Sequence, residues 1–428
     1  MNVLHVVQGY FPAIGGTERV IQLVSERLVA DYGDKVTVYT TPAYNCELFW
    51  RRDQPSLPIG VEVRDGVTIR RFPLFNRLNY LRRKLSDYAT KYKLPYNDRC
   101  RALLNGPLIP GLTQAIAESG ADVIAASSFP LMHMHYALEG GKRAGIPVIY
   151  YGGIHAADDW GFNRPMIYKA IKEVNAYISY TTFEKNYLIG RGIDPDKITP
   201  VGVGIDPEPF EEADGTELRQ RFRLGNDPIV AFVGQQVPYK GIESVIDAME
   251  HVWKKIPNAR LLIAGSRTTY SETLAVKISR LPVEHRLNVV TFDNFKENEK
   301  AAIFAACDIL AFPSVFESFG IVFLEAWSAR KPVIGLRLNA TSTVVDDGID
   351  GLLIIPNDCK DLARAICELL EDDERRVRMG NAGYNKVRKK YTWDVVIEKY
   401  RNVYLSTLKD GGQAEKKRAK VRKKALPV

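Results

Sequence analysis

The chain of 428 residues has few cysteines, and they are scattered. They are Cys46, Cys100, Cys307, Cys359 and Cys367. None belongs to a Cys-x-x-Cys pair, which excludes a disulfide framework and a zinc site of that spacing. Free thiols of this kind fit a reducing, cytoplasmic compartment.

Long hydrophobic runs are also missing. No stretch approaches the roughly 20 apolar residues of a membrane-spanning helix. Residues 1–7 (MNVLHVV) have the pattern of a strand rather than of a signal peptide. We therefore expect a soluble protein, with any membrane contact peripheral and on the inner face.

Two common nucleotide-binding motifs, GxGxxG and GxxxxGK[ST], are absent. Gly15 and Gly16 do follow an apolar strand, residues 2–8, and precede a helix over residues 18–30 that Thr17 is expected to cap. Such glycines allow a phosphate to approach the helix N-terminus closely. A plain tight turn explains them equally well, so they do not identify a site by themselves.

What the sequence does contain is a regular alternation of short apolar strands and amphipathic helices in both halves. This alternation is typical of doubly wound parallel sheets, the α/β class. A chain of this length is expected to form two domains. The stretch 200–206 (PVGVGID) is rich in glycine and proline and marks the predicted hinge.

The net charge of +8 is concentrated in two segments, residues 77–101 and 414–424. Within 78–105, Tyr80, Leu81, Leu85 and Tyr88 share one helical face, flanked by Arg and Lys. One interpretation is an interfacial helix on an anionic membrane; the other, which we favour at this point, is a helix packed on its own domain. For the basic C-terminal segment, nucleic acid, anionic lipid and a solvated tail are all open.

The most informative stretch is residues 313–335, PSVFESFGIVFLEAWSARKPVIG, which follows the apolar strand 308–312. Glu317 precedes a predicted helix and Glu325 lies within it, eight positions further on. Two such carboxylates can bind the hydroxyls of a sugar and of a ribose. Exposed glutamates would be the simpler interpretation of the spacing alone. The segment 319–321 between them places free N–H groups at a helix N-terminus.

Two further residues lie where parallel strands end. His155 follows the strand 147–151, at the edge where such sheets bind ligands. A surface histidine is the alternative, and the position favours function. Lys240 lies in the loop GQQVPYKG, residues 234–241, between a strand and a helix, where an ammonium group can meet a phosphate. A solvated loop lysine is the alternative here.

In this order, these motifs resemble glycosyltransferase family 4, nucleotide-sugar-dependent enzymes of the GT-B fold. The resemblance implies two Rossmann-like domains facing across a cleft: an acceptor domain, 1–203, and a donor domain, 204–392. It also implies a last helix, 393–410, that returns to the first domain. The segment 411–428 would be a basic, disordered tail.

The resemblance also implies a role for individual residues. Glu317 would hold the donor sugar, helped by the backbone of Phe319, Gly320 and Ile321, and Glu325 would hold the ribose. Lys240 would neutralise the diphosphate and Gly16 would approach it. His155 would lie beside the reacting sugar, and Asn294 and Phe295 would border the nucleobase.

One position departs from the family pattern, because Gln235 stands where an arginine is usual. The substitution removes a permanent charge and a bidentate donor from the phosphate site. Gln235 can still donate hydrogen bonds, and Arg267 is the expected compensating residue.

The resulting hypothesis is a retaining hexosyltransferase that uses a nucleotide-diphosphate-sugar and a glycan or lipid-linked acceptor of the cell envelope. We expect no metal site, no required cofactor and no nucleic-acid partner. Anionic membrane is the further partner considered, through 77–101 and 414–424. The alternatives are a non-catalytic nucleotide-sugar or nucleic-acid-binding protein and a nucleotide-sugar epimerase.

Overall fold

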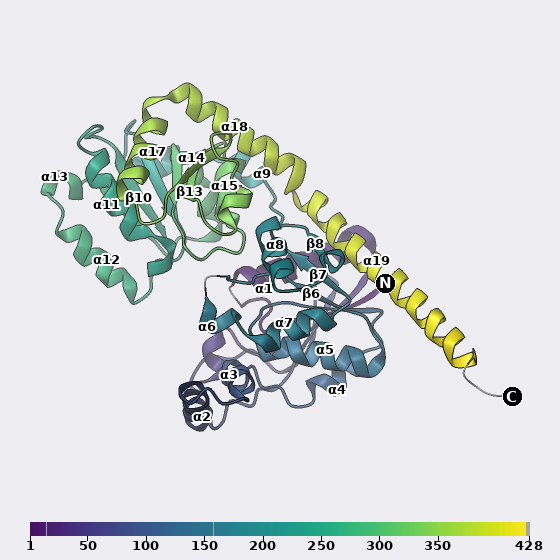
Figure 1. Ribbon diagram of the computed structural model, residues 1–428. Helices are drawn as coiled ribbons and strands as arrows, with labels where there is room; N and C mark the ends of the chain where they lie inside the picture. Colours follow the sequence, from purple (N-terminus) through teal and green to yellow (C-terminus); the bar gives the residue numbers. More distant parts are fainter. Residues whose placement is uncertain (14, 157, 425–428) are drawn as a thin grey trace. The chain divides into compact units, whose positions relative to one another are not determined.

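The computed structural model describes residues 1–13, 15–156 and 158–424, with side chains described as far as residue 409. The chain forms two compact units, and Figure 1 labels their elements. Unit 1 comprises Met1–Gly202 together with the C-terminal stretch that begins at Ile397. Unit 2 comprises Val203–Val396. The chain passes from one unit to the other inside the glycine-rich stretch 200–206.

Unit 1 contains a sheet of short, largely buried strands. They are β1 (Asn2–Val6), β2 (Lys35–Thr40), β3 (Gly60–Arg64), β4 (Val67–Arg71), β5 (Val123–Ala126), β6 (Val148–Tyr151), β7 (Ala176–Ser179) and β8 (Ile198–Pro200). Their order is β3-β4-β2-β1-β5-β6-β7-β8. All neighbours are parallel except β3 and β4, which form an antiparallel pair joined by residues 65–66. Because β1 lies between β2 and β5, the strand order reverses there.

Unit 1 also contains helices, several of which connect its parallel strands. They are α1 (Gly16–Tyr32), α2 (Asn79–Lys91), α3 (Asn97–Asn105), α4 (Leu112–Ala117), α5 (Met132–Ala144), α6 (Asp159–Phe162), α7 (Pro165–Glu173), α8 (Thr182–Gly190) and most of α19 (Trp393–Lys424). The start of α1 differs from the prediction. Gly15, in extended conformation, is the residue before the helix, and Thr17 lies in its first turn rather than capping it.

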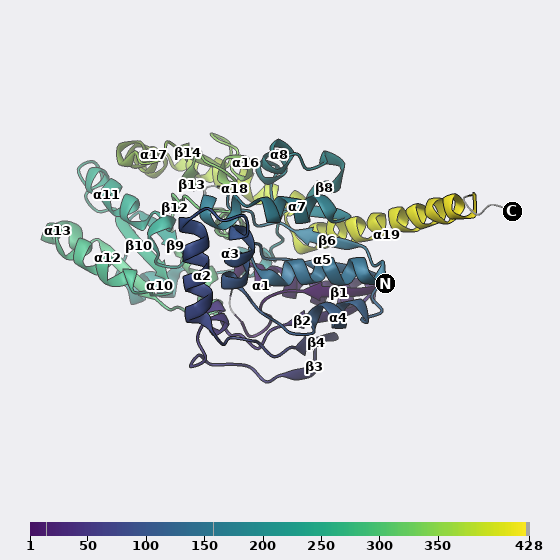
Figure 2. The ribbon, with the colours of Figure 1, turned by 60° about the horizontal axis from the view of Figure 1, so that its bottom comes forward.

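The segment 78–105 forms α2 and α3, which lie side by side (Figure 2). Arg82 joins them, because its guanidinium donates to the carbonyl oxygens of Leu103 (2.9 Å from Nε) and Leu104 (3.1 Å). The apolar face of α2 is nevertheless exposed: Tyr80 by 70%, Leu81 by 60%, Leu85 by 52% and Tyr88 by 57%. The interpretation of this face as packed on its own domain is therefore wrong. In α2 only Ser86 and Ala89 are buried.

The last helix, α19, packs on unit 1 through one row of side chains. The Tyr404 hydroxyl meets His5 Nε2 at 2.9 Å, and the Tyr400 hydroxyl donates to the Gly202 carbonyl at 3.0 Å. Arg401 pairs with Asp34 at 3.0 Å. The backbone is helical as far as Lys424, whereas the sequence predicts a disordered tail from residue 411. The side chains of 410–424, and residues 425–428 altogether, lie outside the described part of the chain.

Unit 2 contains a second sheet, all of whose pairs are parallel. Its strands are β9 (Ile229–Val233), β10 (Arg260–Gly265), β11 (Val289–Asp293), β12 (Ile309–Phe312), β13 (Val333–Leu336) and β14 (Gly351–Ile354). The order β11-β10-β9-β12-β13-β14 is that of a dinucleotide-binding Rossmann sheet. The strand order reverses between β9 and β12, whose residues are all buried.

Helices connect these strands in turn, as the alternation in the sequence predicts. They are α9 (Glu208–Glu211), α10 (Thr216–Arg221), α11 (Ile242–Val252), α12 (Tyr270–Ser279), α13 (Val283–Arg286), α14 (Lys300–Ala306), α15 (Ile321–Ser328), α16 (Thr341–Val344), α17 (Cys359–Glu371) and α18 (Asp373–Lys390). Trp327, on α15, is fully buried and donates to the Asp350 carbonyl at 2.8 Å. This hydrogen bond anchors α15 to the residue that precedes β14.

Candidate active site

The predicted donor residues of unit 2 gather where its strand order reverses. Lys240 lies in the loop between β9 and α11, and Glu317 in the loop between β12 and α15. These two loops leave the carboxyl ends of adjacent strands, which is where open α/β sheets bind ligands. A backbone hydrogen bond from Val315 N to the Tyr239 oxygen (2.9 Å) holds the loops together.

Lys240 and Glu317 form an ion pair between Lys240 Nζ and Glu317 Oε1. The side chains are 19% and 11% exposed, so the pair is mostly shielded from water yet open on one side. Lys240 also lies 5.1 Å from the centre of the Phe312 ring, which adds a cation–π contact. A cation that can bind a phosphate and a carboxylate that can accept from a hydroxyl are thus neighbours.

The start of α15 follows directly. Gly320, the residue before the helix, has φ +91°, and a Cβ at this position would come within 2.6 Å of the Phe323 ring. Glycine is therefore required both by the backbone and by the packing. Phe319 is buried against Tyr391, with ring centres 5.5 Å apart. This fixes the first N–H groups of the helix, including that of Ile321, beside Glu317.

Glu325 is buried in α15, whereas the sequence suggests a carboxylate that is available to a ligand. Lys300, on α14, contacts its Oε1 at 3.1 Å and also contacts Glu297 at 2.9 Å. Burial raises the pKa of Glu325, and Lys300 opposes that rise. Burial would lower the pKa of Lys300, but the two carboxylates outweigh it and raise that pKa. The sequence analysis did not predict Lys300, since nothing local connects it with Glu325.

The remaining predicted donor residues surround the same strand ends. Gln235 is exposed in the loop after β9. Arg267, after β10, pairs with Asp293 at 3.2 Å, so its guanidinium is already occupied by a carboxylate. Asn294, after β11, accepts from the Arg267 N–H at 3.1 Å, and Phe295 packs on Phe292 with ring centres 5.7 Å apart. Arg267 is thus held towards β11.

In unit 1, Gly16 and His155 follow β1 and β6. A Cβ built on Gly16 would meet no atom within 4 Å, whereas one on Gly15 would come within 2.2 Å of Glu18. Packing therefore explains Gly15 but leaves open space beside Gly16. His155 is half-buried, with its ring 5.3 Å from that of Phe162 in an edge-to-face arrangement. Its predicted position beyond the end of a parallel strand is confirmed.

A residue that the sequence analysis missed holds the loop before His155. Glu184, buried in the first turn of α8, accepts at one oxygen from the N–H groups of Gly153 (2.9 Å) and Ile154 (3.0 Å). Its other oxygen accepts from Tyr180 N at 2.9 Å. The sequence Thr181-x-x-Glu184 is a capping-box pattern and was the available signal. In the fold this carboxylate instead accepts from the loop that follows the neighbouring strand β6.

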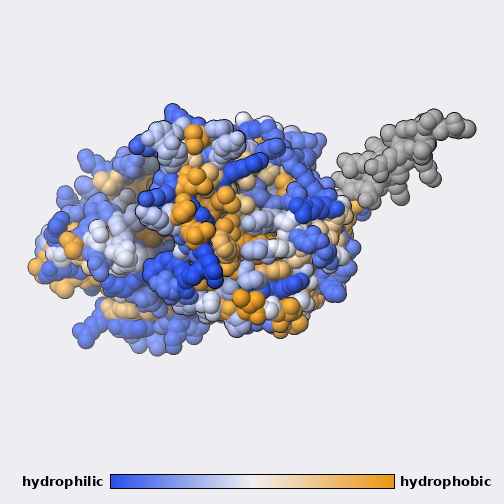
Figure 3. Space-filling view, turned by 90° about the horizontal axis from the view of Figure 1, so that it is seen from below, coloured by the Kyte–Doolittle hydropathy of each residue, from blue (hydrophilic) through white to orange (hydrophobic). Residues whose placement is uncertain are grey.

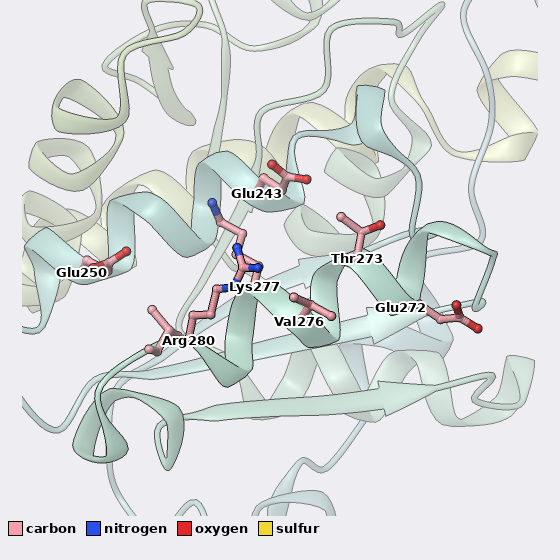
Figure 4. Close-up of a pocket in the computed structure, with 8 residues that line it drawn as sticks. Glu243, Glu250, Glu272, Thr273, Val276, Lys277 and Arg280 are labelled. Atoms are coloured by element: carbon pink, nitrogen blue, oxygen red, sulfur yellow. The ribbon is translucent and has the colours of Figure 1, made fainter.

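A separate hollow of about 680 Å³ lies between α11 and α12 of unit 2 (Figure 4). Its lining mixes acidic residues such as Glu243 and Glu250 with Lys277 and Arg280. Lys277 pairs with Asp247 at 2.6 Å, and the Tyr270 hydroxyl contacts Glu243. Since Lys277 is already paired with a carboxylate, we assign no ligand to this hollow. Among the described residues, no group of three or more His, Cys, Asp or Glu could hold a metal ion.

Two doubly wound α/β units, one with a polar site where its strand order reverses, define a protein of the GT-B fold. Residues 14–209 match the family described as Glycosyltransferase Family 4, and residues 214–386 match Glycosyl transferases group 1. Only residues 210–213 separate the two matches. The chain belongs to glycosyltransferase family 4, as its motifs predict.

Similar curated proteins carry related names. The D-inositol 3-phosphate glycosyltransferase of Stackebrandtia nassauensis is 31% identical over 290 residues, which are 62% of this chain and 65% of the relative. The protein of the same name from Corynebacterium glutamicum is 33% identical over 220 residues, 49% of this chain and 52% of the relative. The chain thus spans less than two thirds of the length of these relatives.

Solved structures with the same fold are more distant in sequence. Anabaena HepE, in complex with UDP-glucose, has a TM-score of 0.72 at 18% identity, covering 95% of this chain and 100% of HepE. The sucrose-phosphate synthase of Thermosynechococcus elongatus has a TM-score of 0.69 at 18% identity, covering 95% and 99%. At this identity, the likeness establishes the fold alone.

Proposed function

We propose that this protein is a retaining glycosyltransferase that moves a sugar from a nucleotide-diphosphate-sugar to an acceptor. The observation that carries the proposal is the pair Lys240–Glu317 between the ends of β9 and β12. In such a donor, the diphosphate is bonded directly to the anomeric carbon. A cation for phosphate must therefore adjoin an acceptor for sugar hydroxyls, and these two side chains do.

The reaction breaks the bond between the anomeric carbon and a diphosphate oxygen. Negative charge grows on the leaving diphosphate, and Lys240 and the N-termini of α11 and α15 would stabilise it. The acceptor oxygen bonds to the same face of the sugar, and its proton passes to the leaving phosphate. No protein nucleophile is then required, and we propose that no metal ion is essential.

Unit 2 would serve as the donor domain, with Glu325 for the ribose and Asn294 and Phe295 beside the base. Lys300 would keep Glu325 ionised and oriented. Unit 1 would serve as the acceptor domain, with the open space at Gly16 for close backbone approach and His155 beside the reacting sugar.

For the acceptor, we propose a glycan or lipid-linked molecule of the cell envelope. The exposed face of α2 supports work at an anionic membrane surface, because apolar side chains there lie among Arg77, Arg83 and Lys84. Figure 3 views the protein from below, the side on which α2 lies in Figure 1. It shows apolar residues (orange) gathered beside hydrophilic ones (blue). Among the helices of the described residues, none combines the length and apolar character needed to cross a bilayer.

The donor is tested first by thermal shift with UDP-, GDP-, ADP- and CDP-sugars, and UDP-glucose heads the panel because HepE binds it. A donor that binds the folded protein raises its melting temperature. The same donors, with candidate acceptors including D-inositol 3-phosphate, are then assayed for release of nucleoside diphosphate. Lys240→Met is expected to lower turnover about 100-fold or more.

The alternative, a nucleotide-sugar-binding protein without transfer activity, is favoured only by Gln235. Donor binding without diphosphate release for any acceptor would select it. Conversion of the donor sugar without an acceptor would instead indicate an epimerase. If Lys240→Met leaves turnover unchanged, the Lys240–Glu317 ion pair has no part in the reaction and the proposal fails at this point.

A further inference from the structure

Two neighbouring arginines of unit 1, Arg101 and Arg164, are buried with part of their hydrogen-bonding capacity unused. Arg101, on α3, is 8% exposed, and Arg164, just before α7, is 1% exposed. Nε and Nη2 of Arg101 and Nη1 of Arg164 are buried, and none finds an acceptor within the described part of the chain. Buried guanidinium nitrogens without a partner are rare, because each costs its full desolvation penalty.

The nearby carboxylates do not fill this need. Asp98 accepts from Arg164 Nε at 3.4 Å, while its other oxygen accepts from Met166 N at 3.0 Å. Asp158 accepts from Gly161 N at 2.8 Å, in the first turn of α6. Both acids attract Arg101 electrostatically, but neither makes a hydrogen bond to it. The unpaired donors of Arg101 and Arg164 thus remain.

The two guanidinium groups are close enough to repel each other. Burial lowers the pKa of Arg164, and the charge of Arg101 lowers it further. Arg101 lies just beneath the surface, since the half-exposed Trp160 ring is 4.8 Å from its guanidinium carbon. Two like charges near the surface, with three unused donor nitrogens, are costly for the fold alone and suited to an anion.

We propose that Arg101 and Arg164 form a binding site for a phosphate group, with Arg101 as the main contact. A phosphate offers several oxygens to the free Nε and Nη2 edge of Arg101 and to Nη1 of Arg164. The site is built from α3, α6 and the start of α7, in the unit to which we assign the acceptor. That the phosphate belongs to the acceptor rests on the proposed function, whereas anion binding itself does not.

The test is a comparison of melting temperatures with inorganic phosphate for the wild type, Arg101→Met and the control Arg99→Met. Arg99 is exposed on the same helix, so the control removes the same charge. Phosphate at about 100 times its dissociation constant should raise the wild-type and Arg99→Met melting temperatures by about 5 °C or more. Arg101→Met should lose that rise, and its own melting temperature without phosphate should equal or exceed that of the wild type.

Phosphate can also bind at Lys240 and raise the melting temperature from there. The decisive quantity is therefore the part of the rise in melting temperature that is lost in Arg101→Met and retained in Lys240→Met. An equal rise in wild type and Arg101→Met would overturn the proposal, with an adventitious ion as the explanation. So would a marked loss of stability in phosphate-free Arg101→Met, because Arg101 would then be structural. Arg101→Lys, which keeps the charge without the fork, should show a reduced rise.

The source of the phosphate is distinguished by two further probes. A soluble sugar monophosphate should bind wild type more tightly than Arg101→Met if the site takes a free phosphoester. Vesicles of phosphatidylcholine with and without phosphatidylglycerol show whether the site takes a lipid headgroup instead. If phosphate binding depends on Arg101 but no donor is ever turned over, the site stands and the proposed function fails.

Discussion

At the scale of single residues, the acidic side chains near the predicted site differ in what holds them. Glu317 faces one lysine in a partly open pair, Glu325 is buried against Lys300, and Glu184 is buried with only neutral donors. A carboxylate in an open pair can exchange its partner for a ligand. Glu184, enclosed by neutral donors, can chiefly orient its surroundings, whereas the Glu325 side chain is still 12% exposed and can accept from a ligand hydroxyl. These residues are therefore expected to respond differently to substitution.

The first prediction compares Glu325→Ala with His155→Ala. If Glu325 binds the ribose as we propose, Glu325→Ala removes a charged hydrogen-bond acceptor and should weaken donor binding about 10- to 100-fold. His155→Ala should leave donor affinity unchanged and slow transfer. Isothermal titration with the donor and single-turnover assays separate the two effects. If both variants lose donor affinity equally, His155 is structural.

The second prediction concerns Glu184 as a positioning residue. In Glu184→Gln, one carboxylate oxygen becomes an NH₂ group, so either Tyr180 N or the loop N–H groups of Gly153 and Ile154 lose their acceptor. We expect kcat to fall about 10- to 100-fold, because His155 moves with its loop, while the donor KM stays constant. Steady-state kinetics with a saturating acceptor measure this.

Tyr177→Phe is the matched control for Glu184. It removes one hydrogen bond to the same carboxylate, 2.7 Å long, but none from the loop. It should cost about 1 kcal/mol of stability and leave kcat nearly unchanged. A fall in kcat that follows stability in both variants would reduce Glu184 to a structural role.

At the scale of elements, α2 shows how a helix can be amphipathic without covering a core. Its few contacts with unit 1 run through small residues and through Arg82, so the larger apolar side chains face outward. Exposed apolar stripes of this kind usually mark an interaction surface. Together with the basic residues of 77–101, this one fits an anionic bilayer better than a neutral partner.

The third prediction is that Leu81→Ser with Leu85→Ser releases the protein from anionic vesicles. Loss of two leucines should weaken binding at least 10-fold, since each contributes about 1.5 kcal/mol or more when fully buried. Co-sedimentation with vesicles containing phosphatidylglycerol measures it. The exposed Val276→Ser with Val283→Ser, in unit 2, is the control. Equal sedimentation of both double variants would exclude α2 as the contact.

At the scale of the whole molecule, unit 1 is closed by contacts between its first strand and its last helix. His5, fully buried on β1, lies between Ser25 (2.6 Å from Nδ1) and Tyr404 (2.9 Å from Nε2). Burial lowers the pKa of His5 to about 3, and that of His133 to about 4. Both rings are therefore neutral in the folded protein under ordinary conditions.

The fourth prediction follows from these histidines. In the unfolded chain they bind protons near pH 6.5, so below that pH the unfolded state holds more protons and stability falls. The loss continues down to about pH 4 for His133 and about pH 3 for His5, at about 1.4 kcal/mol per pH unit for each. Melting temperatures between pH 7.5 and 5 measure it.

His5→Gln should flatten this pH dependence, and His251→Gln, at a half-exposed position of unit 2, should not. A melting temperature that is constant from pH 7.5 to 5 in the wild type would contradict the prediction. Glutamine keeps a donor and an acceptor for Ser25 and Tyr404, so the variant should remain folded.

Much of this fold could be predicted from the sequence because its signals are local. The strands predicted at 147–151 and 308–312 are found there, as Val148–Tyr151 and Ile309–Phe312. The strand β8 was missed, because Ile198–Pro200 is too short to show a period. The exposure of α2 could not be predicted, since an amphipathic pattern does not say what covers the apolar face.

By itself the sequence determined the alternation of strands and helices, the motif order and hence the family, because periodicity and turn residues act between near neighbours. Only the tertiary structure decided which charges meet. Lys240 and Glu317 are 77 positions apart, and Arg164 and Asp98 are 66 apart. Such pairings depend on which strand ends and helices lie side by side, and no local pattern encodes that.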